Sequence, residues 1–139
     1  MRPIEGTTEM IAAMKPVLLP GDFVFCSTRD DGIKAQAFAV ATAFFNEDEG
    51  ASFILPSDKA ERFGFPTDLK MRQITLSVLS SLEGIGLTAA VSGALTRRGI
   101  PCNIVSATHH DHVFVPSDMA DDAVKTLIDV QDNRAPSVG

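Results

Sequence analysis

The sequence has 139 residues, of which 45% are hydrophobic and 22% are charged, a balance typical of one folded domain or of two very small modules that share a core. Its 12 basic and 18 acidic residues give a net charge of −6, which disfavours nucleic acid or an anionic membrane as the partner. Because no apolar run approaches the ~20 residues that span a bilayer, and the N-terminus lacks a signal-peptide pattern, we expect a cytoplasmic protein.

The N-terminal half predicts several short elements. A short helix is expected over 7–14, followed by a strand over 22–28 and a second strand in the apolar stretch 37–45. The acidic segment 46–50 predicts a solvent-exposed turn, which leads into another strand and then into a helix that ends near Gly64.

An internal repeat relates the two halves of the chain. "FILPSDKA" at 53–60 matches "VFVPSDMA" at 113–120, an offset of 60 residues. Each copy predicts a buried strand that ends at proline, and a helix that begins with Ser57 or Ser117 as its N-cap. A repeated strand-to-helix junction predicts two related half-modules.

The C-terminal half begins with a strand and a helix. Residues 73–79 alternate between apolar and polar side chains, which predicts a half-buried strand with Ile74, Leu76 and Val78 on its inner face. The segment 86–99 predicts a helix that stops at Gly99. Its apolar residues recur at helical spacing: Leu87, Val91, Ala94 and Leu95.

A hairpin and a second helix complete this half. Strands are expected over 100–108 and 112–116, and a helix is expected from Ser117, whereas the tail has no apolar period and is expected to fray. The apolar stripe of that helix is Ala120, Ala123, Val124, Leu127 and Ile128. The β-α-β-β-α order predicts an α+β, ferredoxin-like fold.

All three histidines of the chain lie in "SATHHDHVFVPSD" at 106–118. Side chains alternate along a strand, so His110 and His112 point one way and Asp111 points the other. Adjacent residues therefore cannot converge on one ion, and no other Cys, His or Glu pair supplies the ligands that zinc requires. A solvated or interface-facing imidazole pair is favoured over a metal site.

A glycine-rich loop separates the strand at 73–79 from the helix that follows. Gly84, Gly86 and Ala89 match the G-x-G-x-x-A pattern of dinucleotide-binding turns, with Asp111 about 25 residues further on. The chain is too short for a six-stranded nucleotide fold, and the acid lies beyond a hairpin turn. We therefore expect no cofactor, but such a turn exposes backbone N–H groups that suit a carboxylate or another small anion.

Topology connects this loop to Asp111. In a right-handed β-α-β-β order the third strand returns between the first two, which places Asp111 beside 80–86. Amide donors on one side and a carboxylate on the other would bind a zwitterion. Alternatively, Asp111 would accept hydrogen bonds from backbone N–H groups of the loop or helix end. Both arrangements are compatible with the sequence.

Nothing in the sequence predicts catalysis. Ser80 and Ser81 lack the G-x-S-x-G frame, and no Ser-His-Asp or Cys-His arrangement follows from the spacing. Cys26 and Cys102 lie outside any CxxC motif and are expected to be reduced, buried residues.

Residues 71–130, above all "SLEGIGLTAAVSGALTRRGIPCNIVSATHHDHVFV", resemble an ACT domain, the βαββαβ module that binds amino acids in metabolic enzymes and sensors. A skeleton of Ile100 or Ile104, Ser106, Asp111 and Val115 is similar to that of aspartokinase-type modules and tandem-ACT sensors. The whole chain resembles small stand-alone bacterial ACT-like proteins. The resemblance implies two packed ACT-like halves, at 1–65 and 66–131, and a frayed tail at 132–139.

The resemblance also implies a site and a function. Ligands of ACT modules lie at the interface of two modules, held by the loop after the first strand and by the aspartate that opens the third. We therefore expect a non-catalytic regulatory protein that binds a small amino acid or a similar metabolite and acts through a homodimer or a separate regulated protein. The alternative is a ligand-free oligomerisation or protein-interaction module. The expected ligand-binding residues are Ser80, Ser81, Glu83, Gly84, Ile85, Gly86 and Asp111.

Overall fold

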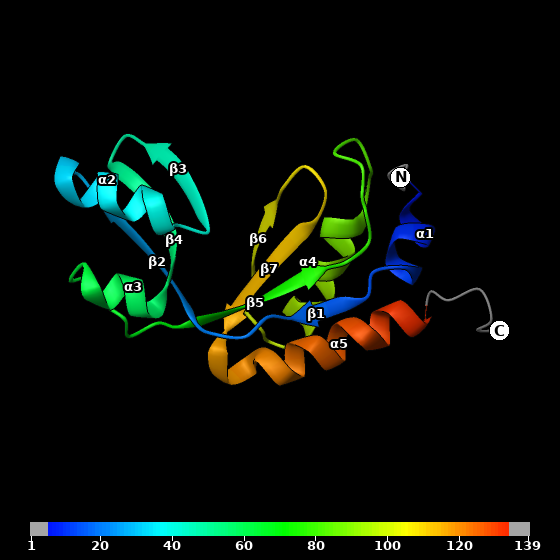
Figure 1. Cartoon of the computed structure of the whole chain (residues 1–139). Coiled ribbons are helices and arrows are strands. Elements are labelled where there is room, and N and C mark those ends of the chain that lie inside the picture. Colours follow the sequence, from blue (N-terminus) through cyan, green and yellow to red (C-terminus); the bar gives the residue numbers. More distant parts are fainter. Residues whose placement is uncertain (1–5, 134–139) are drawn as a thin grey trace. The chain divides into compact units, whose positions relative to one another are not determined.

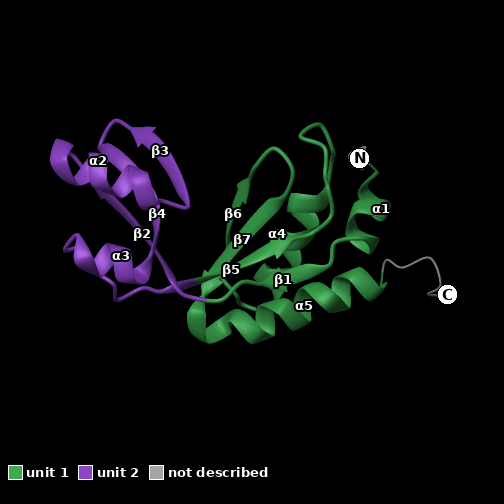
Figure 2. Ribbon diagram, in the orientation of Figure 1, with its two compact units in different colours: residues 1–20, 72–139 green, residues 21–71 purple. Residues whose placement is uncertain are grey.

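The computed structural model describes residues 6–133, which belong to two compact units (Figures 1 and 2). Unit 2 is Gly21–Met71, and unit 1 combines the segment up to Pro20 with the chain from Arg72 onward. The two expected halves, 1–65 and 66–131, are each one continuous segment of the chain. Unit 1 is instead built from two separate segments, because the first helix and the first strand pack with the C-terminal half.

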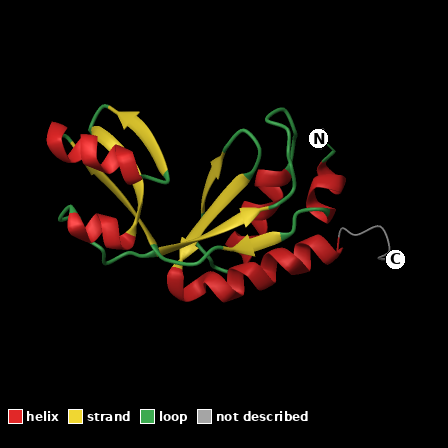
Figure 3. Cartoon of the chain, in the orientation of Figure 1, coloured by secondary structure: helices red, strands yellow, loops and turns green. Residues whose placement is uncertain are grey.

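Unit 2 is a three-stranded antiparallel sheet with two helices (Figure 3). The strand order is β3-β4-β2, and the core lies between this sheet and the helices. Val24, Phe53 and Leu55 of the sheet pack there with Ala37 and Ala60. The elements are β2 (Phe23–Thr28), α2 (Asp31–Val40), β3 (Ala43–Glu47), β4 (Gly50–Pro56) and α3 (Ser57–Arg62).

The strand expected over 37–45 is wrong in its first part. Helix α2 continues to Val40, and β3 begins only at Ala43. Asp30 caps this helix, since its Oδ1 accepts the N–H of Ile33 at 2.8 Å. Ala37 is buried against the sheet, so the apolar stretch reflects one helix face followed by a strand.

Unit 1 is a four-stranded sheet with three helices. Its strands follow the order β1-β5-β7-β6, and β1 pairs with β5, and β6 with β7, in antiparallel fashion. Strand β7 lies between β5 and β6, as the crossover rule predicts. The elements are α1 (Thr7–Ala12), β1 (Pro16–Leu18), β5 (Met71–Leu76), α4 (Leu87–Arg97), β6 (Asn103–Ser106), β7 (Asp111–Pro116), a 3₁₀ turn η1 (Ser117–Met119) and α5 (Ala120–Asn133).

The core of unit 1 contains most of the residues expected there. The four apolar residues predicted on α4 are all buried, and Gly99 follows the helix with φ +71°. On α5 the stripe is narrower than expected, because Ile128 is 40% exposed. This helix also includes residues 131–133, where fraying was expected, and 134–139 lie outside the described residues.

Both units share the order β-α-β-β-α, and the sequence repeat falls at equivalent junctions, β4–α3 and β7–η1. The predicted ferredoxin-like fold and duplication are therefore confirmed. The expected caps are wrong by one residue, since Pro56 and Pro116 occupy the N-cap positions and form no side-chain cap bond. Ser57 instead donates its backbone N–H to the Asp22 carbonyl at 2.9 Å. Within 6–133 no helix is both long enough and apolar enough to cross a bilayer.

Candidate functional site

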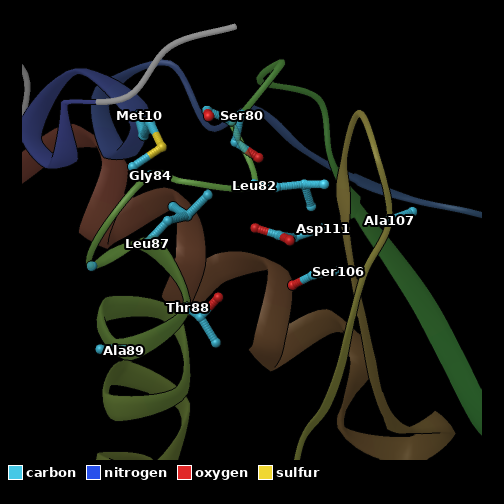
Figure 4. Close-up of a pocket in the computed structure, with 12 residues that line it drawn as sticks. Met10, Ser80, Leu82, Gly84, Leu87, Thr88, Ala89, Ser106, Ala107 and Asp111 are labelled. Carbon is cyan, nitrogen blue, oxygen red and sulfur yellow. The ribbon is translucent and has the colours of Figure 1, made fainter.

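Unit 1 contains a cavity of about 440 Å³ at the ends of β5 and β6, the start of β7 and the N-terminus of α4 (Figure 4). Five of the seven expected binding residues line it. Glu83 and Ile85 do not, and Ile85 is 79% exposed. The lining residues are Met10, Ser80, Ser81, Leu82, Gly84, Gly86, Leu87, Thr88, Ala89, Ser106, Ala107 and Asp111.

Asp111 opens β7 and is only 7% exposed. It pairs with Ser106 of β6, and Figure 4 shows its carboxylate between Ser106 and Leu82. Within 6–133 its carboxylate has no hydrogen bond or ion pair, yet every fully buried side-chain oxygen in that range has a partner. The carboxylate therefore remains accessible from the cavity. The alternative in which Asp111 accepts backbone N–H groups of the loop is not observed.

The N-terminus of α4 forms the opposite side of the cavity. Gly86 is its N-cap residue, with φ +102°, and no side chain caps the helix. In the first backbone hydrogen bond of this helix, the Ala90 N–H donates to the Gly86 carbonyl at 2.9 Å. The N–H groups of Leu87, Thr88 and Ala89 have no partner within 6–133, and all three residues line the cavity. The positive end of the helix dipole thus lies at the cavity that also receives the Asp111 carboxylate.

Helix α1 holds the glycine-rich loop in place. The Thr7 hydroxyl donates a hydrogen bond to the Ile85 carbonyl, and Met10, which is 1% exposed, packs beneath Gly84. A Cβ atom on Gly84 would lie 3.1 Å from the Met10 sulfur, and one on Gly86 would lie 2.7 Å from Thr7 Cγ2. Gly86 is therefore required by the close approach of α1, whereas a Cβ atom on Gly84 would need its neighbours to shift by a few tenths of an ångström. Met10 was not predicted as a site residue, because no local sequence pattern connects it with residues more than 70 positions downstream.

The loop is also attached to β7 and within itself. The buried Ser80 donates its N–H to the His109 carbonyl at 3.3 Å. Ser81 accepts two bonds from the turn that follows: its hydroxyl from the Glu83 N–H at 3.1 Å, and its carbonyl from the Gly84 N–H at 3.0 Å. Glu83 thus shapes the loop through its backbone, while its side chain is exposed.

The histidines tie β7 to β5. His110 Nδ1 donates to the Val78 carbonyl at 3.1 Å, so this nitrogen carries the proton. His112 Nδ1 lies 3.0 Å from Thr75 Oγ1 and 3.3 Å from Gln73 Nε2 on the face of β7 away from Asp111. Burial lowers the pKa of His112, the charge of His110 lowers it further, and Asp111 acts in the opposite direction. No group of three or more metal-ligating side chains occurs in residues 6–133.

Comparisons with known proteins agree with this architecture. Two family models, both described as ACT domain, match residues 5–72 and 69–129. We found no match among curated proteins.

Several solved structures are similar. A Vibrio cholerae protein of unknown function, described as a possible transport protein, is 35% identical over 87% of this chain and 92% of that one, with a TM-score of 0.77. An Agrobacterium tumefaciens protein is 18% identical over 85% and 89%, with a TM-score of 0.67. The ligand-free regulatory subunit of aspartate kinase from Thermus thermophilus is 12% identical over 85% and 97%, with a TM-score of 0.63. The last two share the fold.

Proposed function

Because this chain belongs to the ACT-domain family and carries two such domains in tandem, we propose that it is a regulatory protein that binds a small amino acid in the cavity of unit 1. The proposed ligand contacts all line the cavity: Ser80, Ser81, Gly84 and Gly86 of the loop that follows β5, the backbone N–H groups of Leu87 to Ala89, and the Asp111 carboxylate. Catalysis has no part in the proposal, and regulation would act on a second copy of the chain or on a separate protein.

The observation that carries the proposal is the unpaired Asp111 carboxylate in a cavity that also holds free backbone N–H groups. The carboxylate has no cationic partner within residues 6–133 and reaches the cavity, where a bound cation would pair with it. The α4 N-terminus favours an anion, because its first backbone N–H groups have no acceptor within residues 6–133. An α-amino acid supplies both the cation and the anion. Its ammonium group pairs with Asp111, and its carboxylate accepts hydrogen bonds from the backbone N–H groups of Leu87 to Ala89.

Thermal unfolding of the full chain with each of the twenty amino acids tests the proposal. A ligand at one hundred times its Kd adds about 2.7 kcal/mol to the free energy of unfolding. We expect at least one amino acid to stabilise the wild type at millimolar concentration. Asp111→Asn, which keeps the shape of the side chain and removes its charge, should abolish this stabilisation, whereas Asp118→Asn at an exposed position of η1 should retain it.

The alternative function, a ligand-free interaction module, predicts a different result. In that case no amino acid stabilises the wild type, and Asp111→Asn changes only the intrinsic stability. If an amino acid binds but Asp111→Asn responds as strongly as the wild type, the protein is a sensor and its site lies elsewhere.

A further inference from the structure

We infer that the cavity of unit 1 selects amino acids whose side chain carries no negative charge, and that it discriminates against aspartate and glutamate. The inference rests on the proposed function, because it concerns the ligand of the same site.

The charge of the lining carries the argument. Asp111 is the one charged residue among the twelve that line the cavity, and no Lys, Arg or His is among them. His110, the nearest imidazole along the chain, points to the Val78 carbonyl on the other face of β7. Among the described residues, the α4 N-terminus is thus the one feature of the lining that favours an anion, and the α-carboxylate of the ligand occupies it.

A second carboxylate on the ligand would have no cationic partner in the described lining and would lie close to Asp111. A cavity of about 440 Å³ is about 9 Å across, and two like charges at that distance in an effective dielectric constant near 20 repel each other enough to weaken binding about 20-fold. Loss of water around an unpaired carboxylate acts in the same direction.

The rest of the lining suits a neutral side chain. It consists of apolar groups and hydroxyl groups, and the hydroxyls can accept or donate one hydrogen bond each without adding charge. The apolar residues are Met10, Leu82, Leu87, Ala89 and Ala107, and the hydroxyl residues are Ser80, Ser81, Thr88 and Ser106.

Calorimetric titration of the wild-type protein with all twenty amino acids tests the inference. Asparagine against aspartate, and glutamine against glutamate, isolate the charge at nearly constant shape. We expect the tightest acidic amino acid to bind at least about tenfold more weakly than the tightest neutral one. An acidic amino acid that binds within tenfold of the best neutral one overturns the inference and leaves the proposed function intact. If no amino acid binds at all, the proposed function itself fails.

A charge added to the lining provides a second test. Ser106 faces Asp111 across the β6–β7 pair, so Ser106→Lys places a cation beside the carboxylate. Because the added cation competes with the ligand's ammonium group for Asp111, this variant should bind every amino acid more weakly, and its preference for neutral over acidic ligands should fall toward equality. The control, Thr96→Lys, adds the same charge at an exposed position near the other end of α4 and should leave the preference unchanged. Equal preferences in both variants would contradict the role assigned to the charge of Asp111.

Discussion

Replacement of Gly86 by alanine tests whether α1 positions the loop of the cavity. Gly86 has φ +102°, a region that L-residues rarely adopt, and alanine there costs about 1 kcal/mol of stability from the backbone alone. Its Cβ would also lie 2.7 Å from Thr7 Cγ2 and 2.9 Å from Thr7 Oγ1. These contacts are too short, so Thr7 must move away from the loop.

The expected magnitude follows from these two effects. Displacement of Thr7 breaks its hydrogen bond to the Ile85 carbonyl, which adds about 1 kcal/mol to the backbone cost. Residual crowding brings the total loss for Gly86→Ala to about 2–3 kcal/mol. Gly99 is the matched control at the other end of α4, because it has φ +71° and no atom within 4 Å of the added Cβ. Gly99→Ala should therefore cost only about 1 kcal/mol.

Urea unfolding at 25 °C measures these differences in stability. A double-mutant cycle then shows how much of the cost of Gly86→Ala comes from its contact with Thr7. Thr7→Ala removes both atoms that crowd the new methyl group. In this background Gly86→Ala should cost no more than Gly99→Ala does in the wild type. The reasoning is refuted if both glycine variants lose the same stability in the wild type, or if Thr7→Ala leaves the cost of Gly86→Ala unchanged.

Three further predictions concern the histidine pair, the core and a thiol. The pKa of His112 is lowered in the folded state, so the unfolded chain binds the proton more readily and wild-type stability should fall as the pH drops below about 6.5. In urea titrations between pH 7.5 and 5.5, the free energy of unfolding of His112→Asn should fall less than that of the wild type. Equal slopes for the two proteins would contradict this. Leu95 is fully buried in the unit 1 core, so Leu95→Ala should cost about 2–5 kcal/mol, while Thr96→Ala at the exposed neighbouring position should cost less than about 0.5 kcal/mol in the same assay. Cys26 and Cys102 were expected to be buried, but both are only half-buried. Partial burial still raises the pKa of the Cys26 thiol to about 11, so at pH 8 iodoacetamide should modify it about one hundred times more slowly than a thiol with the ordinary pKa of 9.0. Peptide mass spectrometry measures these rates, and comparable rates in native and urea-unfolded protein would contradict the raised pKa.

The parts of the fold that could be predicted depend on local patterns and on handedness. The spacing of Leu87, Val91 and Leu95 identified both α4 and its buried face, because a helix repeats every 3.6 residues whatever lies around it. The right-handed crossover placed Asp111 beside the loop that follows β5, and the cavity contains both. Strand alternation separated Asp111 from His112, and the structure places them on opposite faces of β7.

The parts that were missed depend on contacts between distant segments. Val17 of β1 pairs with Thr75, and Thr7 and Met10 of α1 contact the loop at 84–86, although nothing in either segment specifies its partner. The partners of the histidines were missed for the same reason. Helix α2 is different, because Asp30 followed by apolar residues at helical spacing is a local signal for a helix N-terminus that was overlooked in favour of the apolar run.

The interleaved order of the units determines when each can fold during synthesis. Unit 2 is complete once Met71 has left the ribosome, so its core can form while the chain is still growing. Helix α1 and strand β1 are made before unit 2, yet β5 and α4, against which they pack, follow the whole of unit 2. Helix α1 and strand β1 therefore have no packing partners until the chain has been made as far as α4. The cavity, which needs Met10 at one end of the chain and Asp111 near the other, is among the last features to form.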